Sequence, residues 1–217
     1  MKVGTDAVLL GAWVNVQGVN HILEVGTGSG VISLMLALRT SVDTKIEAIE
    51  IEKENAEQAK ENVIRSPWPE KIKIHHQSFQ SFQSDTKFDL IVSNPPFFIN
   101  SQLPPSDKRS QARHTGSLSY QELITRSLTL LKPSGKLAVV LPFEEGKLFQ
   151  SLAHKNNLHL VRQLSFYSRQ GKPQERWLFE FAFEPTTITT QNLILHAKGE
   201  DWSDDYKMLL KDFYLKL

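Results

Sequence analysis

The chain has 217 residues, of which 40% are hydrophobic and 23% charged, so it can bury one sizeable core and has the composition of an ordinary globular protein. It contains no cysteine, which excludes disulfides, thiolate zinc sites and cysteine-ligated iron–sulfur clusters. A formal net charge of +1 predicts no general affinity for nucleic acid, and no apolar stretch is long enough to span a bilayer. The opening residues lack the pattern of a signal peptide, so we expect a cytoplasmic protein.

Short β-branched runs alternate with helical patterns from residue 20 onward, which is typical of a mostly parallel sheet covered by helices. In chain order we expect strands at 20–25, 45–51, 71–76, 88–93 and 136–141, and helices at 31–39, 53–64, 118–131 and 144–155. A hairpin at 158–167 and 176–183, a strand around 193–196 and a helix around 206–215 follow. The predicted fold is α/β and Rossmann-like: a mostly parallel seven-stranded sheet with an antiparallel C-terminal hairpin, and helices on both faces.

No repeat, low-complexity segment or linker divides the sequence, so residues 1–217 are expected to form a single domain. The segment 100–117 is polar, contains proline and shows no period, which predicts a long loop. Loops of this length are commonly functional or disordered.

A glycine-rich turn joins the first expected strand to the first expected helix. Residues 24–30 read Glu-Val-Gly-Thr-Gly-Ser-Gly, and glycines there let the chain turn tightly and let a ligand approach the backbone at a helix N-terminus. Dinucleotide-binding folds place the third glycine one position later, at Val31, so this spacing favours S-adenosylmethionine over NAD. The alternative is a tight strand–helix connection without a ligand. The candidate cofactor-binding residues of this turn are Glu24, Gly26, Thr27, Gly28 and Gly30.

Glu50 lies near the end of the second expected strand, where a carboxylate can accept hydrogen bonds from both ribose hydroxyls of an adenosyl group. Glu52 and Glu54 are interpreted as solvated charges at a helix start. After the third strand, where related folds often carry an acid that holds the adenine amino group, the sequence has Ser78 and Phe79. We expect Ser78 or a backbone amide to replace the acid, with Phe79 beside the ring. The neighbouring histidines show no metal-ligand spacing, so no metal is predicted.

The fourth expected strand ends in Asn94-Pro95-Pro96-Phe97, at the edge where open α/β sheets bind ligands. The exocyclic amino group of a base is a poor nucleophile because its lone pair is delocalised. Two acceptors on its hydrogens, the Asn94 side-chain oxygen and the Pro95 carbonyl, would aim this lone pair at a sulfonium methyl, which also places Asn94 against the cofactor. The prolines preset the carbonyl direction, and Phe97 offers a face for stacking the target ring. The alternative is a proline-capped strand end with a core phenylalanine.

Four segments carry a more specific pattern: KVGTDAVLLGAW at 2–13, NPPF at 94–97, ARH at 112–114 and DFYL at 212–215. With them the chain resembles the bacterial tRNA (adenine-N6) methyltransferases that modify valine tRNA. The resemblance implies methylation of the adenine just 3′ of the anticodon, and implies that Lys2, Thr5 and Asp6 lie near the methionine end of the cofactor. Family members carry further residues before the opening segment, so residues 1–19 are expected to be a cofactor-side segment that starts part-way through the family pattern.

Two basic segments flank the expected reaction centre. Each by itself is equally well interpreted as a solvated loop. Together, beside a site for a base that must be splayed out of an anticodon loop, they predict a rim that holds tRNA phosphates. The candidate RNA-binding residues are Lys108, Arg109, Arg113 and His114 in the long loop, and Arg169 and Lys172 in the hairpin connection.

Three alternative functions remain open. Glutamine-N5 methyltransferases of peptide release factors use a similar Asn-Pro-Pro-Tyr site but carry a helical domain before the glycine turn, whereas only 25 residues precede Gly26. Guanine-N2 methyltransferases of ribosomal RNA use Asn-Pro-Pro-Phe but usually have a duplicated domain. The third alternative is a non-catalytic nucleic-acid-binding module, against which the presence of both Asn94 and Glu50 argues.

Overall fold

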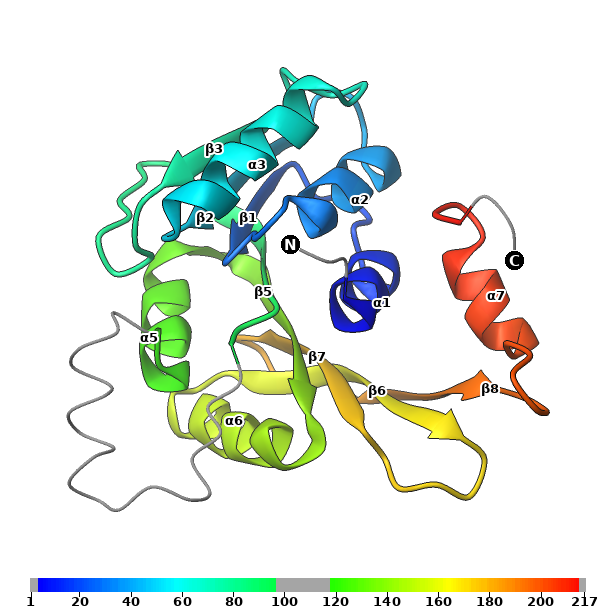
Figure 1. Cartoon of the computed structure of the whole chain (residues 1–217). Helices are drawn as coiled ribbons and strands as arrows, with labels where there is room; N and C mark the ends of the chain where they lie inside the picture. Colours follow the sequence, from blue (N-terminus) through cyan, green and yellow to red (C-terminus); the bar gives the residue numbers. More distant parts are fainter. Residues whose placement is uncertain (1–3, 97–117, 215–217) are drawn as a thin grey trace, which may run out of the picture.

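One eight-stranded sheet runs through the residues that the computed structural model describes, 4–96 and 118–214 (Figure 1). The strand order is β3-β2-β1-β4-β5-β7-β6-β8. The first five strands pair in parallel: β1 (His21–Val25), β2 (Lys45–Glu50), β3 (Ile72–His76), β4 (Phe88–Ser93) and β5 (Leu131–Pro142). The antiparallel hairpin consists of β6 (His159–Arg169) and β7 (Arg176–Ala182), and β7 also pairs antiparallel with β5. The predicted Rossmann-like α/β fold is confirmed.

Eight strands were expected along the chain but only seven in the sheet, and the structure places all eight in it. β8 (Thr189–His196) pairs in parallel with β6 at the edge of the sheet and begins before the strand expected around 193–196. Its first four residues are polar and exposed, so they carry no hydrophobic alternation that could mark a strand. Backbone pairing with β6 alone makes this segment a strand.

Helices cover both faces of the sheet (Figure 1). One core includes side chains of α1 (Thr5–Trp13), α2 (Val31–Arg39), α3 (Lys53–Ile64) and α7 (Asp204–Leu210). The other core includes side chains of α5 (Tyr120–Leu130) and α6 (Phe143–Lys155). The helices α2 and α3 have the predicted bounds, whereas α7 ends at Leu210 rather than near residue 215. Over the described ranges, none of these helices is both long and apolar enough to cross a membrane.

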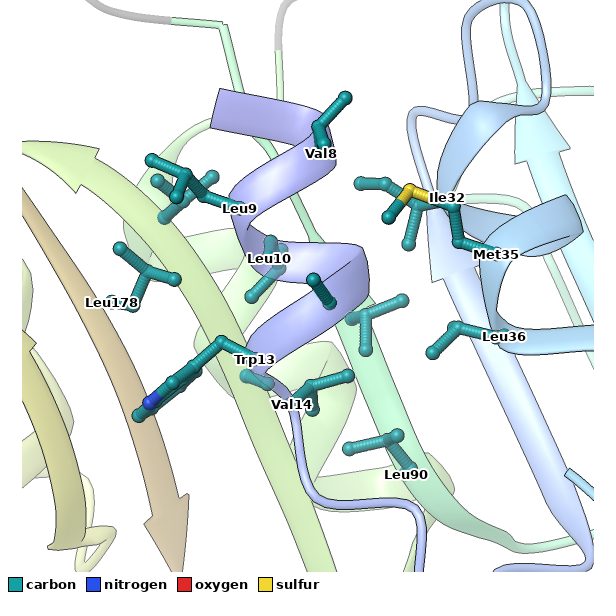
Figure 2. Close-up of a cluster of buried hydrophobic side chains, with 14 of the residues drawn as sticks. Val8, Leu9, Leu10, Trp13, Val14, Ile32, Met35, Leu36, Leu90 and Leu178 are labelled. Carbon is teal, nitrogen blue, oxygen red and sulfur yellow. The ribbon is translucent and has the colours of Figure 1, made fainter. Parts of the chain in front are cut away.

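The helix α1 has no counterpart among the predicted elements because it is apolar all round. Every residue from Val8 to Trp13 is buried. In Figure 2 the helix lies between Leu178 of β7 on one side and Met35 and Leu36 of α2 on the other. A helix enclosed in this way has no polar face, so its sequence lacks an amphipathic period.

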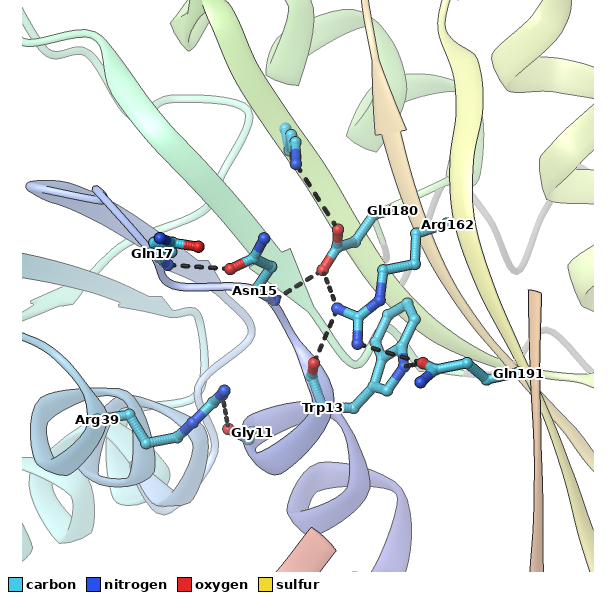
Figure 3. Close-up of polar contacts among 9 residues, drawn as sticks. Gly11, Trp13, Asn15, Gln17, Arg39, Arg162, Glu180 and Gln191 are labelled. Carbon is cyan, nitrogen blue, oxygen red and sulfur yellow. Dashed lines mark hydrogen bonds and ion pairs between the residues drawn. The ribbon is translucent and has the colours of Figure 1, made fainter. Parts of the chain in front are cut away.

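The C-terminal end of α1 rests on a buried charge pair between β6 and β7 (Figure 3). Glu180 is 1% exposed and accepts hydrogen bonds from Arg162 Nη1 at 3.0 Å and from the backbone N–H of Asn15 at 2.7 Å. Arg162 also donates to the Trp13 carbonyl at 3.0 Å and to Gln191 Oε1 at 3.2 Å. Its guanidinium lies 4.1 Å from the centroid of the Trp13 ring. The network therefore joins α1 to β6, β7 and β8.

We expect Arg162→Met to lower the free energy of unfolding by about 3 kcal/mol, because it leaves the Glu180 carboxylate buried with one charged partner fewer. This loss lies at the lower end of the range for a broken buried ion pair, because two other groups remain beside Glu180. They are the Asn15 N–H at 2.7 Å and Lys136 Nζ at 4.0 Å. Urea unfolding of both proteins measures the change. The control is Arg169→Met, which removes an exposed ion pair and should cost no more than about 1 kcal/mol. Equal losses in the two variants would contradict this account.

Candidate functional site

A cavity of about 510 Å³ lies at the carboxyl ends of β1, β2 and β4. Because parallel strands end at the same edge of the sheet, the segments that follow them face one another there. The cavity is lined by the glycine turn after β1, the end of β2, the loop after β3, residues 94–96 after β4 and the start of α1. Its volume lies within the range of small-molecule sites.

The glycine turn depends on backbone conformations that favour glycine. The φ angle is 77° at Gly26, 57° at Gly28 and 87° at Gly30. The Gly26 N–H donates to the carbonyl of Ile49 at 2.9 Å, which holds the turn against β2. A Cβ on Gly30 would lie 3.5 Å from Cβ of Ala59, so α3 packs directly onto the turn. The turn therefore presents backbone, without bulky side chains, to the cavity.

Glu24 lines the cavity and is 1% exposed. One carboxylate oxygen accepts hydrogen bonds from the Thr27 hydroxyl at 2.7 Å, from the Ser33 N–H at 2.9 Å and from the Ser33 hydroxyl. Burial raises the pKa of Glu24 to about 7, although the hydrogen bonds from Ser33 and Thr27 act to lower it. The group therefore titrates near neutral pH, and a cation bound beside it would favour the ionised form.

Glu50 is the last residue of β2 and is 7% exposed. One carboxylate oxygen accepts a hydrogen bond from the Gly28 N–H at 2.8 Å, and the other from the Glu52 N–H at 2.9 Å. A carboxylate oxygen has two lone pairs, so each oxygen keeps one for a further donor. Because Glu50 lines the cavity, this acceptor capacity is available to hydroxyl groups of a ligand.

The loop after β3 forms another wall of the cavity and includes Ser78 and Phe79. The Ser78 hydroxyl accepts a hydrogen bond from the Ser81 N–H at 3.2 Å and lies 2.9 Å from the Ser81 hydroxyl. Phe79 is 3% exposed and belongs mainly to the core. Much of the hydrogen-bonding capacity of Ser78 is thus used within its own turn, whereas Gln77 and Gln80 also line the cavity.

Asn94 follows β4 and carries an unusual buried acceptor. Its Oδ1 atom is buried and has no hydrogen-bond partner among the described residues. Ser93 holds the end of β4 to β1, since its hydroxyl donates to the Val25 carbonyl at 2.9 Å. Pro95 and Pro96 line the same cavity as Asn94. An unpaired buried acceptor costs about 1–3 kcal/mol, and this one belongs to a residue that lines the cavity.

The first turn of α1 meets the cavity through Gly4 and Ala7. Thr5 and Asp6, which were expected near the cofactor, are not among the described residues that line the cavity. The Asp6 carboxylate instead accepts a hydrogen bond from Arg176 Nε at 2.9 Å. The structure thus brings the start of α1 to the site but directs the Asp6 side chain to β7.

The hairpin residues expected to bind RNA lie apart from the cavity. Lys172 is exposed in the turn between β6 and β7, and Arg169 pairs with Glu200 at 2.5 Å. Across the residues with described positions, no three His, Cys, Asp or Glu side chains group as a metal site. The predicted site residues that lie outside the described ranges are Lys2, Phe97, Lys108, Arg109, Arg113 and His114.

Sequence reasoning missed several residues that line the cavity. Ile51 lines the cavity and is 46% exposed. Its position directly after the expected ribose acceptor Glu50 could have indicated that it belongs to the site. The others carry no pattern of their own and face the cavity only because the strand ends meet there. They include Gly4, Ala7, Ser29, Glu52, Asn55, Gln77, Gln80 and Leu118.

Comparison with known proteins defines the class. Residues 3–153 match the family model described as methyltransferase small domain. A predicted O-methyltransferase from Agrobacterium tumefaciens is similar in structure, with a TM-score of 0.75 and 16% identity, covering 95% of this chain and 96% of that one. The glycopeptide N-methyltransferase MtfA, solved with S-adenosylmethionine, has a TM-score of 0.59 and 11% identity, covering 85% and 90%. The protein is a class I S-adenosylmethionine-dependent methyltransferase.

Sequence relatives narrow this class. The tRNA1(Val) (adenine(37)-N6)-methyltransferase of Bacteroides thetaiotaomicron is 42% identical over 217 residues, covering all of this chain and 92% of the relative. The protein of the same name from Tolumonas auensis is 39% identical, covering all of this chain and 91% of the relative. The chain therefore belongs to the family of tRNA1(Val) (adenine(37)-N6)-methyltransferases, as its resemblance predicted.

We expect Glu24→Gln to change how stability depends on pH. Because burial raises the pKa of Glu24 from 4.5 to about 7, the folded protein binds more protons than the unfolded chain between these values. The contribution of Glu24 to the free energy of unfolding is therefore greatest at the acidic end of this window and falls by roughly 3 kcal/mol towards neutral pH. Urea unfolding across the window measures this fall as the difference between wild type and Glu24→Gln.

The matched control for this measurement is Glu54→Gln, which removes an exposed carboxylate. A pH profile of Glu24→Gln that runs parallel to that of the control would show that the Glu24 pKa is not raised.

Proposed function

We propose that this protein transfers the methyl group of S-adenosylmethionine to the exocyclic N6 of adenine 37 in tRNA1(Val). The observation that carries the proposal is the unpartnered Asn94 Oδ1, buried at the same cavity as the glycine turn and Glu50. The names of the sequence relatives support this substrate over a glutamine amide or the N2 group of guanine. A tRNA substrate also accords with the cytoplasmic location expected from the sequence.

The chemistry of the lining residues fits the proposed cofactor. The free acceptor positions of Glu50 suit the two ribose hydroxyls, and the wall with Ser78 and Phe79 suits the adenine ring. Glu24 can ionise beside the positively charged methionine end. When bound, S-adenosylmethionine would supply the electrophilic methyl group.

Asn94 and Pro95 would activate the amino group of the target adenine. The Asn94 side-chain oxygen and the Pro95 carbonyl accept hydrogen bonds from its two hydrogens, which draws the nitrogen lone pair out of conjugation. The nitrogen–carbon bond forms as the carbon–sulfur bond breaks, and the surplus amino proton passes to water. In-line transfer of this kind depends on positioning more than on a strong base.

The proposed tRNA contacts are the basic side chains of two segments, the β6–β7 turn and the segment 100–117. Arg169 and Lys172 come from the β6–β7 turn, and Arg169 would exchange its partner Glu200 for a phosphate. The remaining contacts are proposed from the sequence alone and are Lys108, Arg109, Arg113 and His114.

A methylation assay tests the proposed function. The full chain, S-adenosylmethionine and a tRNA1(Val) transcript are incubated, and nucleoside digests are analysed by mass spectrometry for N6-methyladenosine. The matched control is a transcript with guanine at position 37. Methylation of the first transcript but not of the second is expected. Equal methylation of both, or none, would overturn the substrate assignment.

We expect Asn94→Ala to lower kcat by about 10²–10³-fold, by analogy with loss of one oxyanion-hole donor. This corresponds to a loss of about 2.7–4 kcal/mol of transition-state stabilisation. The variant keeps the Pro95 carbonyl, so one of two acceptors remains. The affinity for S-adenosylmethionine, measured by calorimetry, should stay nearly unchanged. The control is Asn192→Ala, on the exposed part of β8. Turnover near the wild-type rate in a folded Asn94→Ala protein would remove Asn94 from the reaction.

We expect Glu50→Ala to weaken S-adenosylmethionine binding at least tenfold, since a hydrogen bond to a charged acceptor is worth about 1.5–3 kcal/mol. Glu52→Ala is the matched control, because Glu52 lines the same cavity but only its backbone N–H takes part in the network. Calorimetry measures both affinities, and a thermal melt shows whether Glu50→Ala still folds. If the two variants bind alike, the ribose contact lies elsewhere.

A further inference from the structure

The first turn of α1 forms part of the cavity wall but has no side-chain cap. Gly4 and Ala7 line the cavity, and Gly4 is the N-cap residue of the helix. Glycine has no side chain that could accept a hydrogen bond from the first N–H groups, and none is made. The position of this turn must therefore depend on contacts with other elements.

One such contact is the ion pair between Asp6 and Arg176. Arg176 Nε lies 2.9 Å from the Asp6 carboxylate, and the two side chains are only 29% and 16% exposed. Arg176 is the first residue of β7 and pairs with Pro142 at the end of β5. Its Nη1 atom also donates to the Glu175 carbonyl at 3.0 Å, which orients the guanidinium. The pair thus joins the cavity end of α1 to the central part of the sheet.

The opposite end of α1 is held separately. Arg162 donates to the Trp13 carbonyl, and the Trp13 indole donates to Gln191 Oε1 at 2.8 Å. With Trp13 anchored, loss of the Asp6–Arg176 pair would release the first turn rather than the whole helix. The residues that would move are those that line the cavity.

We infer that Arg176 is a positioning residue for the methyl donor. Its ion pair with Asp6 keeps Gly4 and Ala7 in the cavity wall. The Asp6 carboxylate serves this ion pair and does not contact the cofactor. This inference rests on the proposed function, because it takes the cavity to be the S-adenosylmethionine site.

The positioning role and a direct role of Asp6 predict effects of different sign. If Asp6 bound the ammonium group of the cofactor, removal of Arg176 would free the Asp6 carboxylate and leave binding unchanged or tighter. If the pair positions the turn, removal of either partner weakens binding by a similar factor. The double variant then binds no more weakly than either single variant, because both changes remove the same interaction.

Calorimetry with S-adenosylmethionine on the full chain tests this inference with Asp6→Asn, Arg176→Gln and the double variant. We expect Kd to rise about three- to tenfold in all three, as for the loss of a partly buried ion pair. At saturating S-adenosylmethionine, kcat for tRNA should stay close to wild type while KM for the cofactor rises. The matched control is Glu144→Gln, which breaks an exposed pair with Lys147 on α6 and should leave Kd unchanged.

Thermal melts establish that each variant is folded, and Arg176→Lys, which keeps the charge, should recover part of the affinity. Unchanged or tighter binding by Arg176→Gln overturns the inference, as do additive losses in the double variant. Failure of the wild-type chain to bind S-adenosylmethionine would instead overturn the proposed function. The two failures are therefore distinguishable.

Discussion

The hydrogen bond from the Gly28 N–H to the Glu50 carboxylate joins two walls of the cavity that lie 22 residues apart in sequence. It can form because β1 and β2 are parallel neighbours, so the glycine turn and Glu50 emerge at the same edge of the sheet. The turn reaches Glu50 only with the positive φ angles of its glycines. This contact partners a buried carboxylate and leaves acceptor positions for a ligand.

Two carboxylates at the cavity meet the cost of burial in different ways. Glu50 divides its oxygens between two backbone N–H groups, whereas Glu24 collects its hydrogen bonds from Thr27 and Ser33 on one oxygen. Desolvation is the larger effect at Glu24 and raises its pKa to about 7. A carboxyl group that gains its charge near neutral pH suits a cofactor that carries positive charge at its sulfonium and ammonium groups.

The cavity also depends on strands far from it in sequence. The helix α1 supplies part of the wall, yet it is held at one end by Arg176 of β7 and at the other by Arg162 of β6. Glu180, almost fully buried, partners Arg162 and so supports the contact with Trp13. The C-terminal hairpin therefore supports the cavity wall formed by α1, and it also carries Arg169 and Lys172, two of the proposed tRNA contacts.

The sequence by itself determined the alternation of strands and helices, the glycine turn, and the placement of Glu50 and Asn94 at strand ends, because periodicity and turn chemistry are local properties. It could not determine α1, whose enclosure removes the amphipathic pattern, or the first half of β8, which is polar and is a strand only through pairing with β6. The family resemblance implied that Asp6 lies near the cofactor, and no sequence pattern indicates its ion-pair partner Arg176, which is 170 residues away. Contacts across such separations arise only when the sheet order brings β7 beside β5 and α1 against both. Tertiary structure alone decided them, because no local pattern encodes which distant side chain will complete a buried pair.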